Sequence, residues 1–465
     1  MGVAAHQLIS RNPARPDDEV LRLTPAGGID LDRAVSRAQE ASAAWGRTPA
    51  PQRGEALRLA ADRIEQAAGE LADLVCREVG KPIAEARGEV ARSAAILRFN
   101  AGLTLDPEGD SLPPADGRSL LFTRRAARGV VGLITPWNFP LAIPLWKLAP
   151  ALAYGNACVL KPSEHSPACA EQLRSLFAGL LPDGVLEVVH GEGDIGAALV
   201  AHPAVRALSF TGSTAVGREV AVELTRRGAA AQCEMGGQNA SIVLADADIE
   251  AAAGMIAPAA MSYAGQKCTA TGRVICEAGI YDQLREALVA AVDAMPVEDP
   301  TDPGCQVGPL IEQAARDAAL AAVGRATASG GRLLRGGEPI GDGGWYMEPT
   351  LVEVDDPGAE LAQEEVFAPV CAMLRAADAG QAAEIADGVR QGLSTAIFTR
   401  DLDRALELTR DLKTGLVRVN QQTSGVDYWA PFGGEKASGI GPREQGRAAR
   451  DFYTSVRTVL ISPSR

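Results

Sequence analysis

Three polar residues in separate glycine- or proline-rich segments have the types that covalent catalysis requires. Cys268 lies in the run GQKCTATG, whose small and polar residues are unlike those of a packed strand. Glu234 lies in CEMGGQN, and Asn138 lies in TPWNFP. A cysteine thiolate can attack a carbonyl carbon, a carboxylate can activate water, and an amide N–H can stabilise an oxyanion. Together these residues indicate nucleophilic catalysis at a carbonyl group, although any long chain contains such residues near glycines.

The other cysteines and the histidines give no sign of a metal site. The eight cysteines are Cys76, Cys158, Cys169, Cys233, Cys268, Cys276, Cys305 and Cys371, and none forms a C-x-x-C pair. The four histidines are scattered along the chain, so we expect no metal. Each cysteine could instead be a small buried apolar residue, as we expect for Cys233. A cysteine hydrolase would need a histidine partner, and no histidine lies near these motifs.

Two glycine-containing segments could bind phosphate groups. The run GEGDIG at 191–196 matches G-x-G-x-x-G, but no acidic residue ends the next predicted strand, so a tight turn is the better interpretation. The run FTGSTAVG at 210–217 lies between a predicted strand and a predicted helix. Ser213 or Thr214 could cap that helix, whose free N–H groups would then attract an anion. An ordinary strand-to-helix turn is the alternative.

The elements that must position these residues alternate between short apolar runs and amphipathic stretches. We expect helices at 33–45, 53–79, from about 141, and at 167–180, and strands at 129–135, 157–160, 186–189 and 207–210. Gly80 should end the second helix. A second alternating set runs from about 240 past 417. The pattern predicts an α/β protein with two doubly wound parallel-sheet domains.

A small β appendage completes the predicted architecture. Residues 105–125 are rich in proline, glycine and aspartate and then apolar, which is typical of an extended hairpin arm. Residues 454–461 form a further strand candidate. Because exposed strand edges need to be covered, we expect this arm to pair with the C-terminal strand of a partner subunit.

Composition limits the possible partners and the location of the chain. The 465 residues carry 45 basic and 59 acidic side chains, for a net charge of −14. An acidic chain repels phosphate backbones and anionic lipids, so nucleic acids and membranes are not expected partners. No apolar run is long enough to span a membrane, and the first residues do not resemble a secretory signal. We therefore expect a cytoplasmic protein.

Seven segments in a fixed order give the chain a recognisable resemblance. They are TPWNFP (135–140), VLKPSE (159–164), FTGSTAVG (210–217), EMGG (234–237), GQKCTAT (265–271), EEVFAPV (364–370) and PFGGEKASGIG (431–441). In order and spacing they resemble the NAD(P)-dependent, non-acylating aldehyde dehydrogenases, over about residues 8–462. The resemblance implies a dinucleotide-binding domain (1–104 and 127–236) and a catalytic domain (237–440). It also implies an oligomerisation arm with a C-terminal strand (105–126 and 441–465) in a homodimer or homotetramer.

The resemblance also implies roles for individual residues. Cys268 would attack a small-molecule aldehyde to form a thiohemiacetal and then a thioester, Asn138 would stabilise the oxyanion, and Glu234 would activate water. Cofactor-binding residues would be Thr135, Pro136, Trp137, Lys161, Ser163, Glu164, Gly193, Phe210, Gly212, Ser213, Val216, Met235, Gly236, Glu365 and Phe367. Substrate-binding residues would be Trp146, Lys267, Thr269, Gln422, Tyr428 and Phe432. The cofactor is NAD or NADP, and Glu164 slightly favours NAD because a carboxylate would repel a 2′-phosphate.

The substrate is predicted from a subgroup pattern. The segments NQQTSGVDYWAPFGG (420–434) and GPREQG (441–446), with Trp146, resemble α-ketoglutarate semialdehyde (2,5-dioxopentanoate) dehydrogenases. Glu435 departs from the basic residue usual there. Alternatives are an enzyme for another small or biosynthetic aldehyde, a CoA-acylating dehydrogenase, or a non-catalytic relative. For a dicarboxylate semialdehyde, Lys267 is the expected anchor of the distal carboxylate, unless it extends to the surface; Gln422, Thr423 and Tyr428 are the next candidates.

Overall fold

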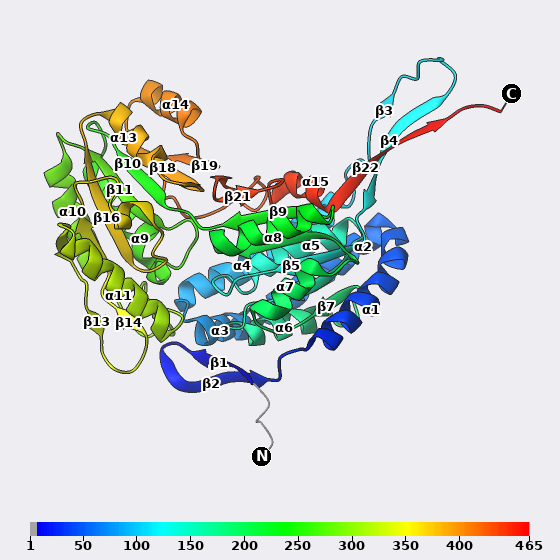
Figure 1. The fold of residues 1–465 in the computed structure, drawn as a ribbon, viewed down its shortest axis with the longest axis horizontal. Coiled ribbons are helices and arrows are strands. Elements are labelled where there is room, and N and C mark those ends of the chain that lie inside the picture. The colour runs from blue at the N-terminus through cyan, green and yellow to red at the C-terminus, as the bar shows by residue number, and fades with distance from the viewer. Residues whose placement is uncertain (1–6, 465) are drawn as a thin grey trace.

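A computed structural model describes residues 7–464. Residues 1–6 of the predicted dinucleotide-binding domain and residue 465 of the predicted C-terminal segment lie outside the described part. Two sheets rich in parallel strands lie side by side in the molecule (Figure 1). The first has the order β21-β9-β8-β5-β6-β7, and the second β12-β15-β16-β11-β10-β18-β19. Only the edge strands β21 and β12 run antiparallel to their neighbours. This arrangement is the α/β architecture predicted from the alternating sequence.

The first sheet is covered by helices on both faces, as expected for a doubly wound fold. Its strands are β5 (Val130–Ile134), β6 (Ala157–Lys161), β7 (Leu186–Val188), β8 (Val205–Gly212), β9 (Ala230–Met235) and β21 (Gly439–Ile440). Alternate strand residues face opposite sides, since Val131 and Leu133 pack in one apolar core and Val130 in another. One face is covered by α1 (Gly28–Arg47), α7 (Gly193–Ala201) and α8 (Thr214–Arg226). The other is covered by α2 (Ala50–Gln66), α3 (Ala68–Val79), α4 (Ile83–Leu103), α5 (Ala142–Ala153) and α6 (Pro167–Phe177).

The single helix predicted at 53–79 was wrong, because the chain forms α2 and α3 there. Ala67 separates the two helices with φ −97° and ψ 15°, outside the helical range. Gly69 lies in the first turn of α3, where glycine's low helix propensity makes one continuous helix less stable. The predicted stop at Gly80 is confirmed: this residue adopts the left-handed conformation (φ 67°) after α3.

The second sheet surrounds its own apolar core. Its strands are β10 (Asn239–Val243), β11 (Thr271–Glu277), β12 (Arg332–Arg335), β15 (Thr350–Glu353), β16 (Val370–Ala376), β18 (Ser394–Phe398) and β19 (Leu416–Val419). Its helices are α9 (Ile249–Met261), α10 (Tyr281–Asp293), α11 (Gln313–Ala328), α12 (Glu360–Gln363), α13 (Ala379–Asp387) and α14 (Leu402–Asp411). Smaller pairs are β1 (Leu8–Asn12) with β2 (Arg15–Leu23), β13 (Pro339–Ile340) with β14 (Tyr346–Met347), and β17 (Gln391–Gly392) with β20 (Glu435–Lys436).

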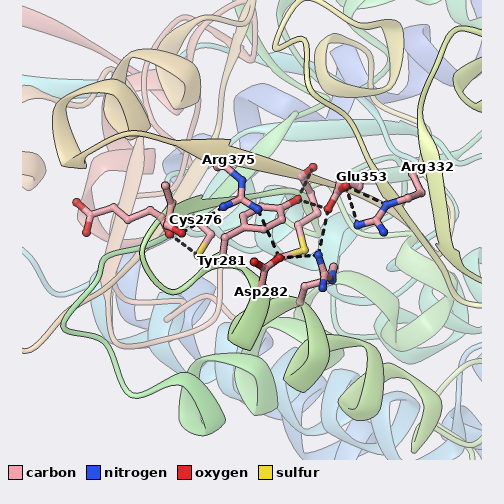
Figure 2. Close-up of polar contacts among 10 residues, drawn as sticks. Cys276, Tyr281, Asp282, Arg332, Glu353 and Arg375 are labelled. Atoms are coloured by element: carbon pink, nitrogen blue, oxygen red, sulfur yellow. Dashed lines mark hydrogen bonds and ion pairs between the residues drawn. The ribbon is translucent and has the colours of Figure 1, made fainter.

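A polar cluster at the carboxyl ends of β11, β15 and β16 fastens α10 to this sheet (Figure 2). The Tyr281 hydroxyl donates to Glu353 at 2.9 Å, and the Arg375 guanidinium lies 4.0 Å from the Tyr281 ring centroid. Glu353 also pairs with Arg332 at 2.8 Å, and Arg375 with Asp282 at 3.4 Å. Cys268 precedes β11 and so belongs to the opposite end of the strands. The cluster therefore holds the fold together and does not contribute to the predicted site.

The predicted arm forms a three-stranded sheet that projects from the body beside the C-terminus (Figure 1). It contains β3 (Ser111–Leu112), β4 (Leu120–Ala127) and β22 (Thr454–Ile461). β22 pairs with β4 of the same chain over its whole length, so the predicted pairing with a partner's C-terminal strand was wrong. The short helix α15 (Ala449–Tyr453) delivers β22 directly to this edge, where Arg128 donates to the carbonyl of Phe452.

Among the described residues, no helix is both long enough and apolar enough to cross a membrane.

Candidate active site

Cys268 lies on a strained loop between α9 and β11. Tyr263, Ala264 and Gly265 all have positive φ, at 55°, 52° and 65°. A side chain at Gly265 would collide with the carbonyl of Ala368, so glycine is needed there. Two of the three residues are not glycine, and such strain persists only where the surroundings enforce it. The backbone is therefore held in one conformation directly before Gln266, Lys267 and Cys268.

The side chain of Gln266 is one of the groups that enforce this conformation. Its amide donates to the carbonyls of Tyr263 at 3.3 Å and Pro309 at 3.2 Å. Its oxygen accepts from the backbone N–H of Ile311 at 2.9 Å. At the start of β10, the Asn239 amide donates to the carbonyls of Cys268 at 2.8 Å and Ala270 at 2.7 Å. The nucleophile candidate thus occupies a fixed position.

Asn138 approaches the same loop from the carboxyl end of β5. Its amide donates to the carbonyl of Gln266 at 2.9 Å, and its side-chain oxygen is buried without a hydrogen bond in the described structure. An asparagine amide has two N–H donors. One of them therefore holds Asn138 against the loop, and the other has no acceptor among the described residues.

Glu234 lies buried on β9, the last strand of the first sheet before the chain enters the second sheet at β10. Its carboxylate accepts the backbone N–H of Gly434 at 3.0 Å, and β9 carries it next to β21. Burial, and then the negative charge of Glu444, raise its pKa well above the ordinary value. Glu444 itself is paired with the buried Lys147, whose ammonium also donates to the Ser209 hydroxyl at 2.7 Å. Glu234 is thus suited to take up a proton.

Cys268 differs from the other cysteines of the chain in its exposure. All eight are free and described, and Cys268 alone is not fully buried. Burial of the sulfur, followed by the nearby carboxylates of Glu365, Glu234 and Glu444, raises the pKa of its thiol to about 12. Without ligands, the thiol therefore keeps its proton at neutral pH. Cys233 is buried, in agreement with its predicted role as an apolar residue.

A cavity of about 280 Å³ opens on one side of Cys268. It is lined by the predicted residues Trp146, Lys267, Thr269, Gln422 and Phe432, and also by Glu85, Gly88, Glu89, Arg92, Phe139, Ser424, Gly425 and Val426. Trp146 and Phe432 pack together there with ring centroids 5.8 Å apart. Tyr428 does not line the cavity, because it packs against Phe99 and Trp429. Thr423 is buried and bonded to Thr271 at 2.8 Å.

Lys267 neither reaches the surface nor presents a free charge to the cavity. Its ammonium pairs with Glu85 at 2.8 Å. Glu85, Glu89 and Arg92 lie on successive turns of α4, and sequence motifs gave no indication of them. The only signal was the i, i+4, i+7 spacing that places these three charged residues on one face of the helix.

A larger cleft of about 620 Å³ lies at the carboxyl ends of the strands of the first sheet. It is lined by the predicted residues Thr135, Pro136, Trp137, Lys161, Ser163, Glu164, Gly193, Phe210, Gly212, Ser213 and Val216. The run at 191–196 begins α7, and both Gly193 and Gly196 face the cleft. Lys161 and Glu164 pair at 3.3 Å. Although burial opposes the effect, Lys161 lowers the pKa of Glu164.

The cleft has the features that a dinucleotide requires. Ser213 caps α8 by accepting the N–H of Val216 at 3.4 Å, so the helix begins with its positive dipole end in the cleft. A Cβ on Gly217 would lie 2.5 Å from the Met235 sulfur, so glycine allows the helix to pack closely. The hydroxyls of Thr135 and Thr211 are buried there without partners in the described structure. These free groups and the helix terminus fit a nucleotide with its phosphates.

Two of the four remaining predicted cofactor residues line a small cavity that Lys267, the neighbour of Cys268, also lines. Glu365 and Phe367 line it, and the Trp137 ring lies 5.9 Å from that of Phe367. Gly236 leaves room for the Glu365 carboxylate, which accepts the N–H of Gly237 at 3.2 Å. Burial raises the pKa of Glu365 to about 7. Met235 lies buried beneath Gly217 and lines neither cavity.

Comparisons with known proteins agree with this geometry. The model of the aldehyde dehydrogenase family matches residues 3–459. The chain is 41% identical over 458 residues to an alpha-ketoglutaric semialdehyde dehydrogenase of Bacillus subtilis (strain 168), covering 97% of this chain and 94% of that protein. It is 37% identical to an alpha-ketoglutarate semialdehyde dehydrogenase of Haloferax volcanii, covering 97% and 95%. An NAD-dependent aldehyde dehydrogenase from Sinorhizobium meliloti has a similar structure, with a TM-score of 0.96, 34% identity, and coverage of 100% of this chain and 93% of that chain. The chain therefore belongs to the aldehyde dehydrogenase family.

Proposed function

We propose that this enzyme oxidises α-ketoglutarate semialdehyde to α-ketoglutarate with NAD. The observation that carries the assignment is that Cys268 lines a cavity for a small substrate, while Asn138, bonded to the Cys268 loop, directly follows residues that line a cleft fitting a dinucleotide. The first would admit the aldehyde and the second the cofactor, so that both meet at one sulfur atom.

The cleft residues would hold the cofactor as follows. The N-terminus of α8, capped by Ser213, would receive the pyrophosphate, and Lys161 with Glu164 would bind the adenosine ribose. Glu164 would accept a hydrogen bond from a free 2′-hydroxyl and repel a 2′-phosphate, which favours NAD over NADP. Glu365 and Phe367 would position the nicotinamide half. The bound cofactor supplies the acceptor for the hydride that leaves the aldehyde carbon.

Cys268 performs the covalent chemistry in this proposal. Its thiol must first give its proton to solvent, so that the Glu234 carboxylate stays ionised for the later hydrolysis. The sulfur then attacks the aldehyde carbon, and the carbonyl electron pair moves to oxygen. The second N–H of Asn138 and the backbone N–H of Cys268 stabilise this oxyanion. When the carbonyl re-forms, the carbon gives up its hydride and a thioester remains on Cys268.

Glu234 then assists hydrolysis. Its carboxylate takes a proton from water as the water oxygen attacks the thioester carbon, and the carbon–sulfur bond breaks to release the acid and the thiolate. The Gly434 N–H orients one carboxylate oxygen, so the other can face the water. A carboxylate that acts as a base must be ionised, and its raised pKa makes hydrolysis faster as pH rises.

The choice of substrate is supported by relatives and by one side chain. Curated relatives named for α-ketoglutarate semialdehyde are 35–41% identical over nearly the whole chain. Trp146 forms an apolar wall with Phe432, where an arginine would favour succinate semialdehyde. This wall leaves the charged residues of α4 to bind the polar end of the substrate.

Domain roles and assembly belong to the same proposal. Residues 1–104 and 127–236 would bind the dinucleotide, and 237–440 would carry the catalytic loop. Residues 105–126 and 441–465 would form the contact between subunits of a cytoplasmic homodimer or homotetramer. Exposed apolar residues on the arm support this, namely Leu120, Val456, Leu460 and Ile461.

A spectrophotometric assay tests the function. The purified enzyme is given α-ketoglutarate semialdehyde, succinate semialdehyde, betaine aldehyde or pentanal with NAD or NADP, and formation of the reduced cofactor is followed with and without CoA. We expect the highest kcat/KM for α-ketoglutarate semialdehyde with NAD, no need for CoA, and no turnover by Cys268→Ala. A strict requirement for CoA or a preference for pentanal would contradict the proposal.

A further inference from the structure

The charges that line the substrate cavity are paired, with one exception. Four charged side chains line it: Glu85, Glu89, Arg92 and Lys267. Glu85 neutralises Lys267 at 2.8 Å, and Glu89 pairs with the buried Lys81. Arg92 forms no hydrogen bond or ion pair with any described residue. The cavity therefore carries one uncompensated positive charge.

A second arginine adds to this positive charge. Arg418 on β19 is half-buried behind the loop at Gly425, where its guanidinium lies 3.8 Å from the position of a Cβ on that residue. Burial and the nearby positive charge of Arg92 lower the pKa of Arg418. Asp427 acts in the opposite direction, but it forms no ion pair with either arginine in the described structure. Arg92 and Arg418 are thus close enough to repel each other, and Asp427 is the one carboxylate that offsets their charge at Arg418.

The position of Arg92 on its helix suits the far end of a substrate. Glu85, Glu89 and Arg92 occupy successive turns of α4, so they face the cavity in a row. Seven residues of helix rise about 10 Å, which separates Arg92 from Glu85 along the helix axis. Glu85 is bonded to Lys267, the neighbour of Cys268. The cavity is therefore charge-neutral beside the nucleophile and positive at its other end.

We propose that Arg92 binds the carboxylate of the semialdehyde and so determines the specificity of the cavity for aldehydes with an anionic tail. The proposal rests on the proposed function, since it names the group that selects the substrate. A guanidinium can hold a carboxylate through two parallel hydrogen bonds, and a half-buried site strengthens them. This assignment takes the role that was expected of Lys267, whose charge is already neutralised.

The test replaces Arg92 by methionine and by lysine, and uses Arg87→Met as the control. Arg87 lies on the same helix but is exposed and lines no part of the cavity, so its variant removes an equal charge from the protein's overall field. The two anionic aldehydes are α-ketoglutarate semialdehyde and glutarate semialdehyde. Pentanal is the uncharged control, because it has the chain length of glutarate semialdehyde without the carboxylate. We expect Arg92→Met to lower kcat/KM for both anionic aldehydes at least about 10-fold, through KM. Pentanal should be oxidised as well as before, Arg92→Lys should recover part of the loss, and Arg87→Met should behave like wild type.

A second measurement does not depend on oxidation. Glutarate should protect the Cys268 thiol of the wild-type enzyme from iodoacetamide, and this protection should need at least about 10-fold more glutarate in Arg92→Met. Equal losses with charged and uncharged aldehydes, or unchanged protection, would overturn the role of Arg92. A wild-type enzyme that is protected by glutarate and prefers another anionic aldehyde would refute only the proposed substrate. No protection of the wild type would overturn the anchor itself.

Discussion

Replacement of Asn138 by alanine measures how much the oxyanion donor contributes. The side chain has two N–H donors, and the carbonyl of Gln266 takes one of them at 2.9 Å. The variant thus loses one hydrogen bond within the protein and one to the transition state. Loss of a single oxyanion donor costs about 2.7–4 kcal/mol of activation free energy, or about 10²–10³ in rate. Loss of the donor to a buried carbonyl costs about 1–3 kcal/mol of folding free energy.

Asn100→Ala provides a matched control for these two effects. Asn100 is also buried, also donates to one backbone carbonyl at 2.9 Å (that of Ile96), and also has an unpaired side-chain oxygen. Both variants should therefore lose similar thermal stability. Only Asn138→Ala should slow the first turnover, measured by stopped-flow formation of the reduced cofactor.

An oxyanion role for Asn138 predicts how kcat, kcat/KM and cofactor affinity change in the variant. Because the second donor acts in the transition state, kcat and kcat/KM should fall by similar factors, and cofactor affinity should not change. A first-turnover rate within 10-fold of wild type, together with the stability loss seen for Asn100→Ala, would refute the oxyanion role. Asn138 would then serve only to hold the catalytic loop.

Three further predictions concern the ionisable groups of the site. Glu234→Gln should form one equivalent of reduced cofactor and then stall. Its residual turnover should not rise with pH, whereas the raised pKa of Glu234 makes wild-type turnover rise. Equal loss of the burst and of the steady-state rate would argue against a role in hydrolysis. The Glu365 carboxyl, with its pKa raised from 4.5 to about 7, stabilises the fold at low pH and loses this contribution as pH rises from about 4.5 through 7. Glu365→Gln should therefore gain stability over wild type across that window, by at most about 3 kcal/mol; a difference in thermal midpoint that does not vary with pH would contradict this. Lys267→Met should slow oxidation of anionic aldehydes, because the negative charge of Glu85 is then no longer neutralised. Adding Glu85→Gln to this variant should restore the rate. If the double variant stays slow, Lys267 has a direct role.

Much of the fold and of the catalytic loop could be predicted because local chemistry determines them. The left-handed Gly80 ends α3, and Ser213 caps α8. Each of these depends on the conformational range or side-chain length of one residue. Alternation of apolar runs and amphipathic stretches likewise predicted both sheets. The break at Ala67 was missed because no proline or strong cap marks it.

Pairings between distant segments could not be predicted in the same way. β22 covers the edge of β4 within one chain, and a sequence pattern does not distinguish this from pairing between subunits. Tyr428 has a type suited to a binding site, yet it packs against Phe99 on α4. Such contacts depend on how the whole chain folds, which side-chain type and spacing do not specify.

The charge of a side chain predicts its role only when its partners are known. Lys267, next to the nucleophile, is the natural candidate for an anionic substrate, but Glu85 cancels its charge from 182 residues away in sequence. Lys147 and Lys81 are likewise matched by Glu444 and Glu89. Burying an unpaired charge is costly, so a cation that folding leaves half-buried and unmatched beside a cavity gains most from an anionic ligand. Among the charged residues that line this cavity, Arg92 alone meets that condition, and it lies on a helix that no motif had marked.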